Sequence, residues 1–292
     1  MKKKLFVSFS GGETSGYMCW YLKNQRQNDF EMIFVFANTG EENEETLKFV
    51  DQCDKEFDLN VVWIEAVFNP EFGIGTNYKI VNYKTASRNG EPFKDGISKL
   101  GISNKVNNWC TRDLKQIPLH KFVKFKLGSK DYLTAIGIRC DEIDRVSKHR
   151  KKNNLYYPLV TDQPMNKPKI NFWWSQQNFR LNLKGYQGNC KACWKKSFNK
   201  LMTIAVEKPE YFDFTKKMEI EFENYVPESK SKSMEKPVRF FRENKSVKEI
   251  FDSSKKPFKK SKNDADVYNY QTSLFNYDLD SSNGCDESCE IF

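Results

Sequence analysis

The sequence predicts an α/β fold: an open, mostly parallel sheet, doubly wound by helices on both faces, with a C-terminal helical extension. Two observations lead to this prediction. Apolar, strand-like runs alternate with helix-like stretches over about the first two hundred residues, which is the rhythm of parallel strands joined by helical crossovers. The run over residues 31–37 is apolar almost throughout, as strands buried on both faces are.

The elements are expected in the following order. The predicted strands are residues 5–10, 31–37, 60–65 and 132–138. The predicted helices are residues 14–24, 42–57, 114–126, 171–180, 197–207, 210–225 and 246–252. We expect three regions: an α/β domain over 1–165, a helical region over 166–252, and a poorly ordered tail over 253–292 that is first basic and then acidic. Ligands of such sheets bind where the strands end, so the turns after residues 10 and 37 are the first candidates for a site.

Composition limits the class of protein. A chain of 292 residues with 38% hydrophobic residues can bury a substantial core, and it has no apolar run near the length of a membrane span. We therefore expect a cytoplasmic protein without a signal peptide or membrane contact. The net charge of +9, with basic clusters at 145–152 and 255–262, favours a polyanionic partner such as nucleic acid, although solvated lysine faces are common.

The first predicted strand runs directly into a Ser-Gly-Gly turn. Gly11 and Gly12 lack the Cβ atoms that would block a ligand, so backbone N–H groups there can surround phosphate oxygens. Ser10, Thr14 and Ser15 add hydroxyl groups, and the following helix adds the partial positive charge of its N-terminus. The Walker pattern is absent because no Gly-Lys-Ser/Thr follows. The simpler alternative is a glycine turn that only joins a strand to a helix.

This loop resembles the PP-loop, SGGx(D/T)S, of the ATP pyrophosphatase and phosphosulfate reductase superfamily. Further segments match that superfamily in the same order: the turn at residues 38–46, the block at 110–119, and the block at 137–145. Residues 83–92 are similar to phosphosulfate-reductase-like proteins of phages and mobile elements. The resemblance implies a fold of the adenine nucleotide alpha-hydrolase-like (HUP) type. The nucleotide-binding residues it implies are Ser8, Ser10, Gly11, Gly12, Thr14, Ser15, Asn38, Thr39, Gly40 and Gly137. The catalytic residues it implies are Lys115, Arg139 and Arg145.

Eight cysteines in a cytoplasmic chain favour metal, cluster or redox chemistry over structural disulfides. Cys190 and Cys193 form a CxxC motif downstream of Cys110. Cluster-bearing sulfonucleotide reductases have a Cys-Cys pair in the block around Cys110, so this chain, with Trp109 beside a single cysteine, matches three of four ligands. Three thiolates can hold a 4Fe–4S cluster with one iron open. Zinc is the main rival, a redox-active disulfide is another, and reduced buried thiols are the simplest alternative.

The remaining cysteines carry less weight. Cys19 and Cys53 lie on apolar helix positions that core packing explains. Cys140 lies within the block at 137–145, called the cationic block below because it contains Arg139 and Arg145, and is not expected to be a ligand. Cys285 and Cys289 lack the Glu-Cys-Gly context of the mobile reductase cysteine, so their role stays open. The peptide Gln271–Phe275 resembles the motif by which bacterial proteins dock on the DNA sliding clamp.

The intact Ser-Gly-Gly loop favours an enzyme that cleaves ATP to AMP and pyrophosphate, because reductases need not hold that leaving group. We therefore expect ATP-dependent adenylation followed by sulfur transfer to a substrate, with Mg²⁺, an iron–sulfur cluster and a nucleic acid as acceptor. Thr14 stands where many ATP pyrophosphatases have Asp, which puts one metal contact in doubt. The alternatives are reduction of phosphoadenosine or adenosine phosphosulfate to sulfite, and a non-catalytic nucleotide-binding subunit docked on the clamp.

Overall fold

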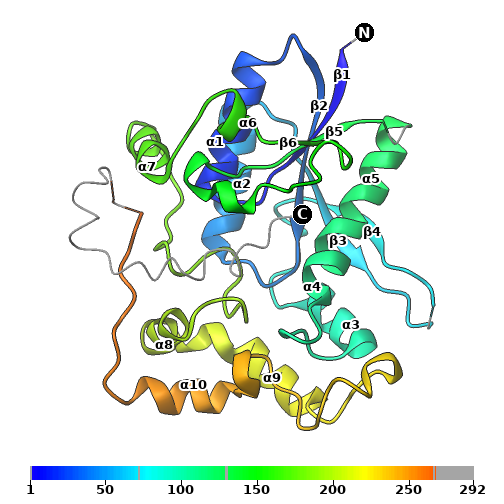
Figure 1. Ribbon diagram of the computed structural model, residues 1–292, viewed down its shortest axis with the longest axis vertical. Helices are drawn as coiled ribbons and strands as arrows, with labels where there is room; N and C mark the ends of the chain where they lie inside the picture. Colours follow the sequence, from blue (N-terminus) through cyan, green and yellow to red (C-terminus); the bar gives the residue numbers. More distant parts are fainter. Residues whose placement is uncertain (1, 72, 129–130, 266, 268–292) are drawn as a thin grey trace.

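The computed structural model describes residues 2–71, 73–128, 131–265 and 267. Within them a six-stranded sheet has the order β4-β3-β2-β1-β5-β6 (Figure 1). The strands are β1 Lys3–Ser8, β2 Phe30–Asn38, β3 Val62–Val67, β4 Asn77–Val81, β5 Leu133–Ala135 and β6 Leu155–Tyr156. All neighbouring strands are parallel except β3 and β4, which form an antiparallel pair at one edge. The predicted α/β class and mostly parallel sheet are confirmed, and the two edge strands β4 and β6 are additions that the sequence analysis did not expect.

Helices cover both faces of the sheet because successive strand residues point to opposite sides. On one face, Leu5 and Val7 of β1 pack in a core with helices α1 (Glu13–Gln25), α2 (Glu44–Phe57) and α7 (Lys167–Ser175). On the other face, Phe6 of β1 packs with α5 (Ile117–Leu127). β1, β2 and β5 are neighbours, so the loops that follow them meet at one edge of the sheet.

A group of C-terminal helices that does not include α7 lies at one end of the molecule (Figure 1). It consists of α8 (Phe198–Glu207), α9 (Asp213–Phe222) and α10 (Val247–Ser254), with short 3-10 turns at Pro209–Phe212, Glu228–Lys230 and Arg242–Asn244. These helices share a core with α3 (Glu91–Leu100) and with Trp109 of the short helix α4 (Trp109–Thr111). A Cβ atom on Gly96 would lie 2.3 Å from the Trp109 ring, so this glycine allows the indole to pack directly against α3.

Helix α3 was not predicted, and several predicted elements differ in their bounds; two of these differences have a clear physical cause or meaning. Helix α7 begins at Lys167 and ends at Ser175, so its start is four residues and its end five residues earlier than predicted. It begins there because the Asn166 side chain caps it by accepting a hydrogen bond from the amide of Lys169. Between α4 and α5, residues Arg112–Gln116 form a π-helical turn, a feature that often occurs at functional sites. The remaining short elements are the 3-10 turn Cys140–Arg145 and helix α6 (Pro158–Thr161).

After α10 the chain returns along the molecule towards α7 (Figure 1). The Asn171 amide donates a hydrogen bond to the Asp264 carbonyl over 2.9 Å, and the Arg180 guanidinium donates one to the Ala265 carbonyl over 3.0 Å. The sequence features Gln271–Phe275, Cys285 and Cys289 lie outside the described residues. Among the helices of the described ranges, none combines the length and apolar character needed to cross a membrane.

Candidate functional site

The loop between β1 and α1 has the geometry of an anion-binding turn. The Ser10 hydroxyl donates to the Ser15 hydroxyl over 2.9 Å, and the Ser15 hydroxyl donates to the Gly12 carbonyl over the same distance. These bonds fold the loop over the first turn of α1, whose N-cap is Gly12. No side chain caps this helix end, so a bound anion can accept hydrogen bonds from its amides.

The two loop glycines are needed for different reasons. Gly11 has a φ of +84°, and a Cβ atom there would lie 2.6 Å from the Thr46 methyl group of α2. Gly12 has an ordinary φ of −100°, and its Cβ would meet nothing closer than the Asn189 side-chain oxygen at 3.7 Å. Gly11 is therefore required by the fold, whereas at Gly12 a side chain would take up space in the loop itself.

The structure brings part of the predicted cationic block to this loop. A Cβ atom on Gly137, which follows β5, would lie 3.1 Å from the Ser15 Cα, so the two segments are in close contact. The Arg139 guanidinium donates to the Thr14 hydroxyl over 3.4 Å, and its Nε lies 2.9 Å from the Asp141 carboxylate. The acidic neighbours outweigh burial and raise the pKa of Arg139. Arg145 lies further along, in an ion pair with Glu142.

An ion pair and an indole hold the start of α1 from the side of α7. The Glu13 carboxylate, nearly buried, lies 3.0 Å from the Arg180 guanidinium. The Trp174 indole N–H donates to the Glu13 carbonyl over 2.8 Å. The sequence analysis assigned no role to Arg180 or Trp174, because neither lies in a motif and their contact with the loop depends on how α7 folds back.

The end of β2 and the turn that follows it carry the predicted nucleotide-binding residues Asn38, Thr39 and Gly40. The Asn38 amide is buried and donates to the Glu65 carboxylate over 2.7 Å and to the Ser87 carbonyl over 2.8 Å. The Gly40 carbonyl accepts from the Gly90 amide over 2.9 Å. The Asn38 side chain therefore fixes the segment around residues 87–90 against the turn.

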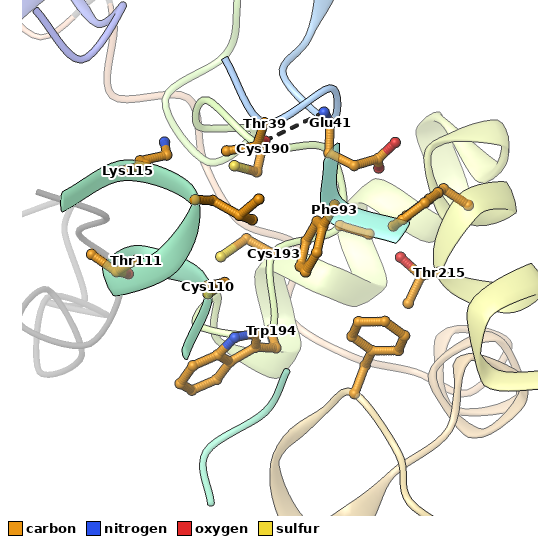
Figure 2. Close-up of a pocket in the computed structure, with 14 residues that line it drawn as sticks. Thr39, Glu41, Phe93, Cys110, Thr111, Lys115, Cys190, Cys193, Trp194 and Thr215 are labelled. Atoms are coloured by element: carbon orange, nitrogen blue, oxygen red, sulfur yellow. Dashed lines mark hydrogen bonds between the residues drawn. The ribbon is translucent and has the colours of Figure 1, made fainter. Parts of the chain in front are cut away.

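The predicted ligand cysteines line one pocket. Cys110 of α4 and the CxxC residues Cys190 and Cys193 share it with Lys115 and Thr39, so the structure brings these five predicted site residues together. Figure 2 shows the three sulfur atoms towards one side of the pocket. The six described cysteines, Cys19, Cys53 and Cys140 included, form no disulfide with one another. Cys19 and Cys53 lie in the core of the sheet domain, as predicted.

Residues 189–193, which carry the CxxC motif and are called the cysteine loop below, contact the turn after β2 directly. Cys190 forms a β-bridge with Glu42, and the Lys191 amide donates to the Glu41 carbonyl over 3.0 Å. The side chain of Asn189 donates a hydrogen bond to the Ser10 carbonyl over 2.8 Å. The same loop therefore also contacts residues 10–15, the predicted phosphate-binding loop, called the phosphate loop below. Residues from the two ends of the predicted site are thus joined across almost 180 positions of sequence.

Glu42 occupies the junction between the turn, Lys115 and the cysteine loop. One oxygen of its buried carboxylate accepts from the Thr39 amide and hydroxyl, both over 2.8 Å. The other lies 3.5 Å from the Lys115 ammonium and 3.9 Å from the Cys190 sulfur. Lys115, in the π-helical turn, is therefore held at the cysteine pocket. The sequence analysis did not identify Glu42, whose only signal is its place next to the Thr-Gly-Glu turn.

Glu41 is the second carboxyl group that reasoning from the sequence missed. It lines the same pocket and is 4% exposed. Burial, together with the nearby Glu42 and Glu91 and against the attraction of Lys191, raises the pKa of Glu41 to about 8. Burial in the pocket thus favours the neutral, protonated form of this carboxyl group.

The three thiol side chains of the pocket are suitable ligands for a thiophilic metal centre. Three thiols in a largely apolar lining are the ligand type used by iron–sulfur clusters and by zinc. Across the described ranges, however, no three His, Cys, Asp or Glu side chains already stand close enough to hold a metal ion. The thiols would have to turn towards a common centre when such a group binds.

Comparison with known proteins agrees with this architecture. The model of the phosphoadenosine phosphosulfate reductase domain matches residues 4–156. The chain is 34% identical to the uncharacterized nin region protein ORF290 of Escherichia phage lambda over 198 residues, and the matched region covers 67% of each of the two chains. It is 24% identical over 206 residues to an uncharacterized protein of Methanocaldococcus jannaschii, which covers 69% of this chain but only 35% of the archaeal one.

The matched range contains both predicted nucleotide-binding turns and the cationic block, and it ends within β6. The cysteine loop and the helices α8 to α10 lie beyond it. The sheet order, the phosphate loop and the family match lead to one conclusion: this chain belongs to the phosphoadenosine phosphosulfate reductase domain family.

Proposed function

We propose that this protein binds ATP at the loop Ser10–Ser15, adenylates a substrate and replaces the activated oxygen with sulfur. The observation that carries the proposal is the direct contact between two halves of the site. Thr39 of the predicted nucleotide-binding turn lines the cysteine pocket, and the Asn189 side chain, next to Cys190, donates a hydrogen bond to the carbonyl of Ser10 in the predicted phosphate-binding loop. An enzyme that couples nucleotide cleavage to sulfur chemistry needs these two functions within reach of one substrate.

In this proposal the first step forms an adenylate. A substrate oxygen attacks the α-phosphorus of ATP, and pyrophosphate leaves with the electron pair of the broken P–O bond. The amides at the N-terminus of α1 and the Arg139 guanidinium would stabilise the charge that develops on pyrophosphate, with Mg²⁺ sharing it. Arg145 would contribute from further along the same segment.

In the second step a donor whose sulfur has the oxidation state of hydrosulfide attacks the activated carbon or phosphorus centre, and AMP leaves with the original oxygen. No net oxidation or reduction accompanies this exchange. Lys115 would hold an anionic group of the substrate or donor at the pocket. We propose that Cys110, Cys190 and Cys193 hold a 4Fe–4S cluster, with zinc as the alternative; such a cluster would carry the incoming sulfur on its open iron.

Anaerobic purification followed by iron and sulfide analysis tests the cluster, and a pyrophosphate-release assay with ATP tests the adenylation step. Replacing Cys193 with Ser should lower the iron content, whereas Cys140→Ser, a change outside the pocket, should leave it unchanged. Protein that contains no iron and releases no pyrophosphate with any nucleic acid offered would refute the proposed mechanism.

A second candidate, favoured by the family match itself, is reduction of phosphoadenosine or adenosine phosphosulfate to sulfite. It predicts sulfite release from the sulfonucleotide with a thiol reductant and no pyrophosphate from ATP. The two assays, run on one preparation, separate the candidates.

Two partners belong to the same proposal. We propose nucleic acid as the acceptor, since Lys148, Arg150, Lys151 and Lys152 are exposed and none of them forms an ion pair with another described residue. We also propose that Gln271–Phe275 docks on the sliding clamp. A pull-down with purified clamp, comparing the full chain with Leu274→Ala/Phe275→Ala, tests the docking; equal retention of both would refute it.

A further inference from the structure

The cysteine pocket has a second end of different chemistry. Away from the thiols it is lined by the aromatic residues Phe93, Phe214 and Phe240 and by the polar residues Glu41 and Thr215. Figure 2 shows Glu41 and Thr215 on the opposite side of the pocket from the sulfur atoms, with Phe93 between. The function proposed above uses the thiol end and leaves this second end unexplained.

The Glu41 carboxyl group forms no hydrogen bond and no ion pair within the described part of the chain, although Lys191 attracts it electrostatically. Its residue is 4% exposed, and its backbone amide and carbonyl are used by Thr39 and Lys191, yet no hydrogen bond or ion pair reaches its side-chain oxygens there. Glu42, its neighbour, has four contacts to its carboxylate. The Glu41 oxygens are not among the fully enclosed polar atoms of the described chain, and the residue lines the pocket, so a group that enters the pocket can bond to them and offset the cost of their burial.

The aromatic residues at this end are fixed in place. The Phe93 and Phe214 rings have centroids 5.6 Å apart and are tilted by 37°. Phe214 also packs directly against Gly90, where a Cβ atom would lie 2.3 Å from its ring, and the Gly90 amide bonds to the Gly40 carbonyl. The rings are thus held against the same turn that carries Glu41. Rigid aromatic walls favour a flat, apolar-faced ligand.

We propose that this end of the pocket binds a planar nitrogen heterocycle of the nucleobase type, with its face against Phe93 and Phe214 and its edge hydrogen-bonded to the Glu41 carboxyl group. A simple cation fits less well, because one carboxyl group among phenylalanines offers too few oxygen ligands. Under the function proposed above, on which this assignment rests, the heterocycle is the sulfur acceptor. One of its ring carbonyl groups would then face the thiols.

The proposal is tested by binding of the four ribonucleosides and of short single-stranded RNA and DNA to the full-length protein, measured by equilibrium dialysis. Glu41→Ala should weaken binding at least about tenfold, as expected for losing a hydrogen bond to an ionisable group. Glu41→Gln keeps the shape and tests whether the carboxyl group itself is required. Glu56→Gln, which changes an exposed carboxyl group of α2 that does not line the pocket, is the control and should bind like wild type.

A second readout locates the binding. A nucleobase in the pocket should slow alkylation of Cys193 by iodoacetamide in wild type and leave the rate unchanged in Glu41→Ala. Binding of free nucleosides, or only of bases within RNA or DNA, supports the proposal and identifies the source of the ring. Absence of binding in every arm, or equal binding by Glu41→Ala, overturns it.

The same preparations are assayed for Mg·ATP binding and pyrophosphate release. Normal ATP turnover without nucleobase binding would refute this assignment alone. Nucleobase binding that depends on Glu41, without pyrophosphate release, would refute the adenylation step and leave the ligand assignment standing.

Discussion

Replacing Gly12 with Ala should separate nucleotide binding from folding. The φ of −100° at Gly12 suits alanine, and the new methyl group would meet no atom closer than 3.7 Å. Folding stability should therefore change by no more than about 1 kcal/mol, because alanine reduces the freedom of the unfolded chain but is a poorer N-cap residue than glycine for α1. The methyl group would nevertheless stand among the loop groups that face a phosphate.

The expected loss of affinity follows from the hydrogen bonds displaced. A bond between a backbone amide and a charged group contributes about 1.5–3 kcal/mol, so losing one should weaken Mg·ATP binding roughly 10- to 100-fold. Isothermal titration calorimetry measures the affinity, and urea denaturation measures the free energy of unfolding.

Gly11→Ala is the matched control with the opposite expectation. Its positive φ and its clash with Thr46, 2.6 Å away, should cost roughly 2–5 kcal/mol of folding stability. Our account of the loop is refuted if Gly12→Ala binds Mg·ATP as tightly as wild type, or if the two substitutions destabilise the protein equally.

Three further predictions concern other parts of the molecule. Arg180→Met should lower the free energy of unfolding by about 2–4 kcal/mol, because it leaves the buried Glu13 carboxylate without its cation, and adding Glu13→Gln should restore most of the loss in urea denaturation. Burial lowers the pKa of His120, so stability from this group is present above pH 6.5 and is lost as the pH falls; thermal melts from pH 7.5 to 5 should show a smaller acid loss in His120→Asn than in the control His149→Asn. Replacing the four cationic residues of the loop 148–152 with Gln should weaken nucleic-acid binding and flatten its salt dependence in fluorescence anisotropy, whereas an unchanged salt slope would exclude this loop from the interface.

The sheet and the phosphate loop could be predicted from sequence because their signals are local. An apolar run followed by Ser-Gly-Gly and a helix defines β1, the loop and α1 within about twenty residues. Strand β4 gave no such signal: its five residues are partly exposed at the sheet edge and show no apolar run. Helix α3 was missed because Gly96 stands in its interior, where glycine is a poor helix former.

The thiol end of the pocket could also be predicted, because its signals are local motifs in the sequence. The CxxC spacing identified Cys190 and Cys193, and the block around Cys110 supplied the third thiol. The other end of the pocket brings together Glu41, Phe93 and Phe214 from three separate segments. Aromatic residues are common in cores, so nothing in their local sequence distinguishes these from ordinary packing. Only the fold brings them to one cavity.

The bridge between Glu42 and Cys190 limits how this protein can be divided. The family match ends at residue 156, which suggests a convenient place to cut an independent nucleotide-binding module. A fragment ending there would keep the phosphate loop but lose Asn189, Arg180 and Trp174, the three side chains that hold the loop from outside the matched range. The contacts thus tie the predicted nucleotide-binding loop and the cysteine pocket into one structural unit, and we expect the sheet domain grafted alone onto another protein to bind nucleotide less tightly than the full chain.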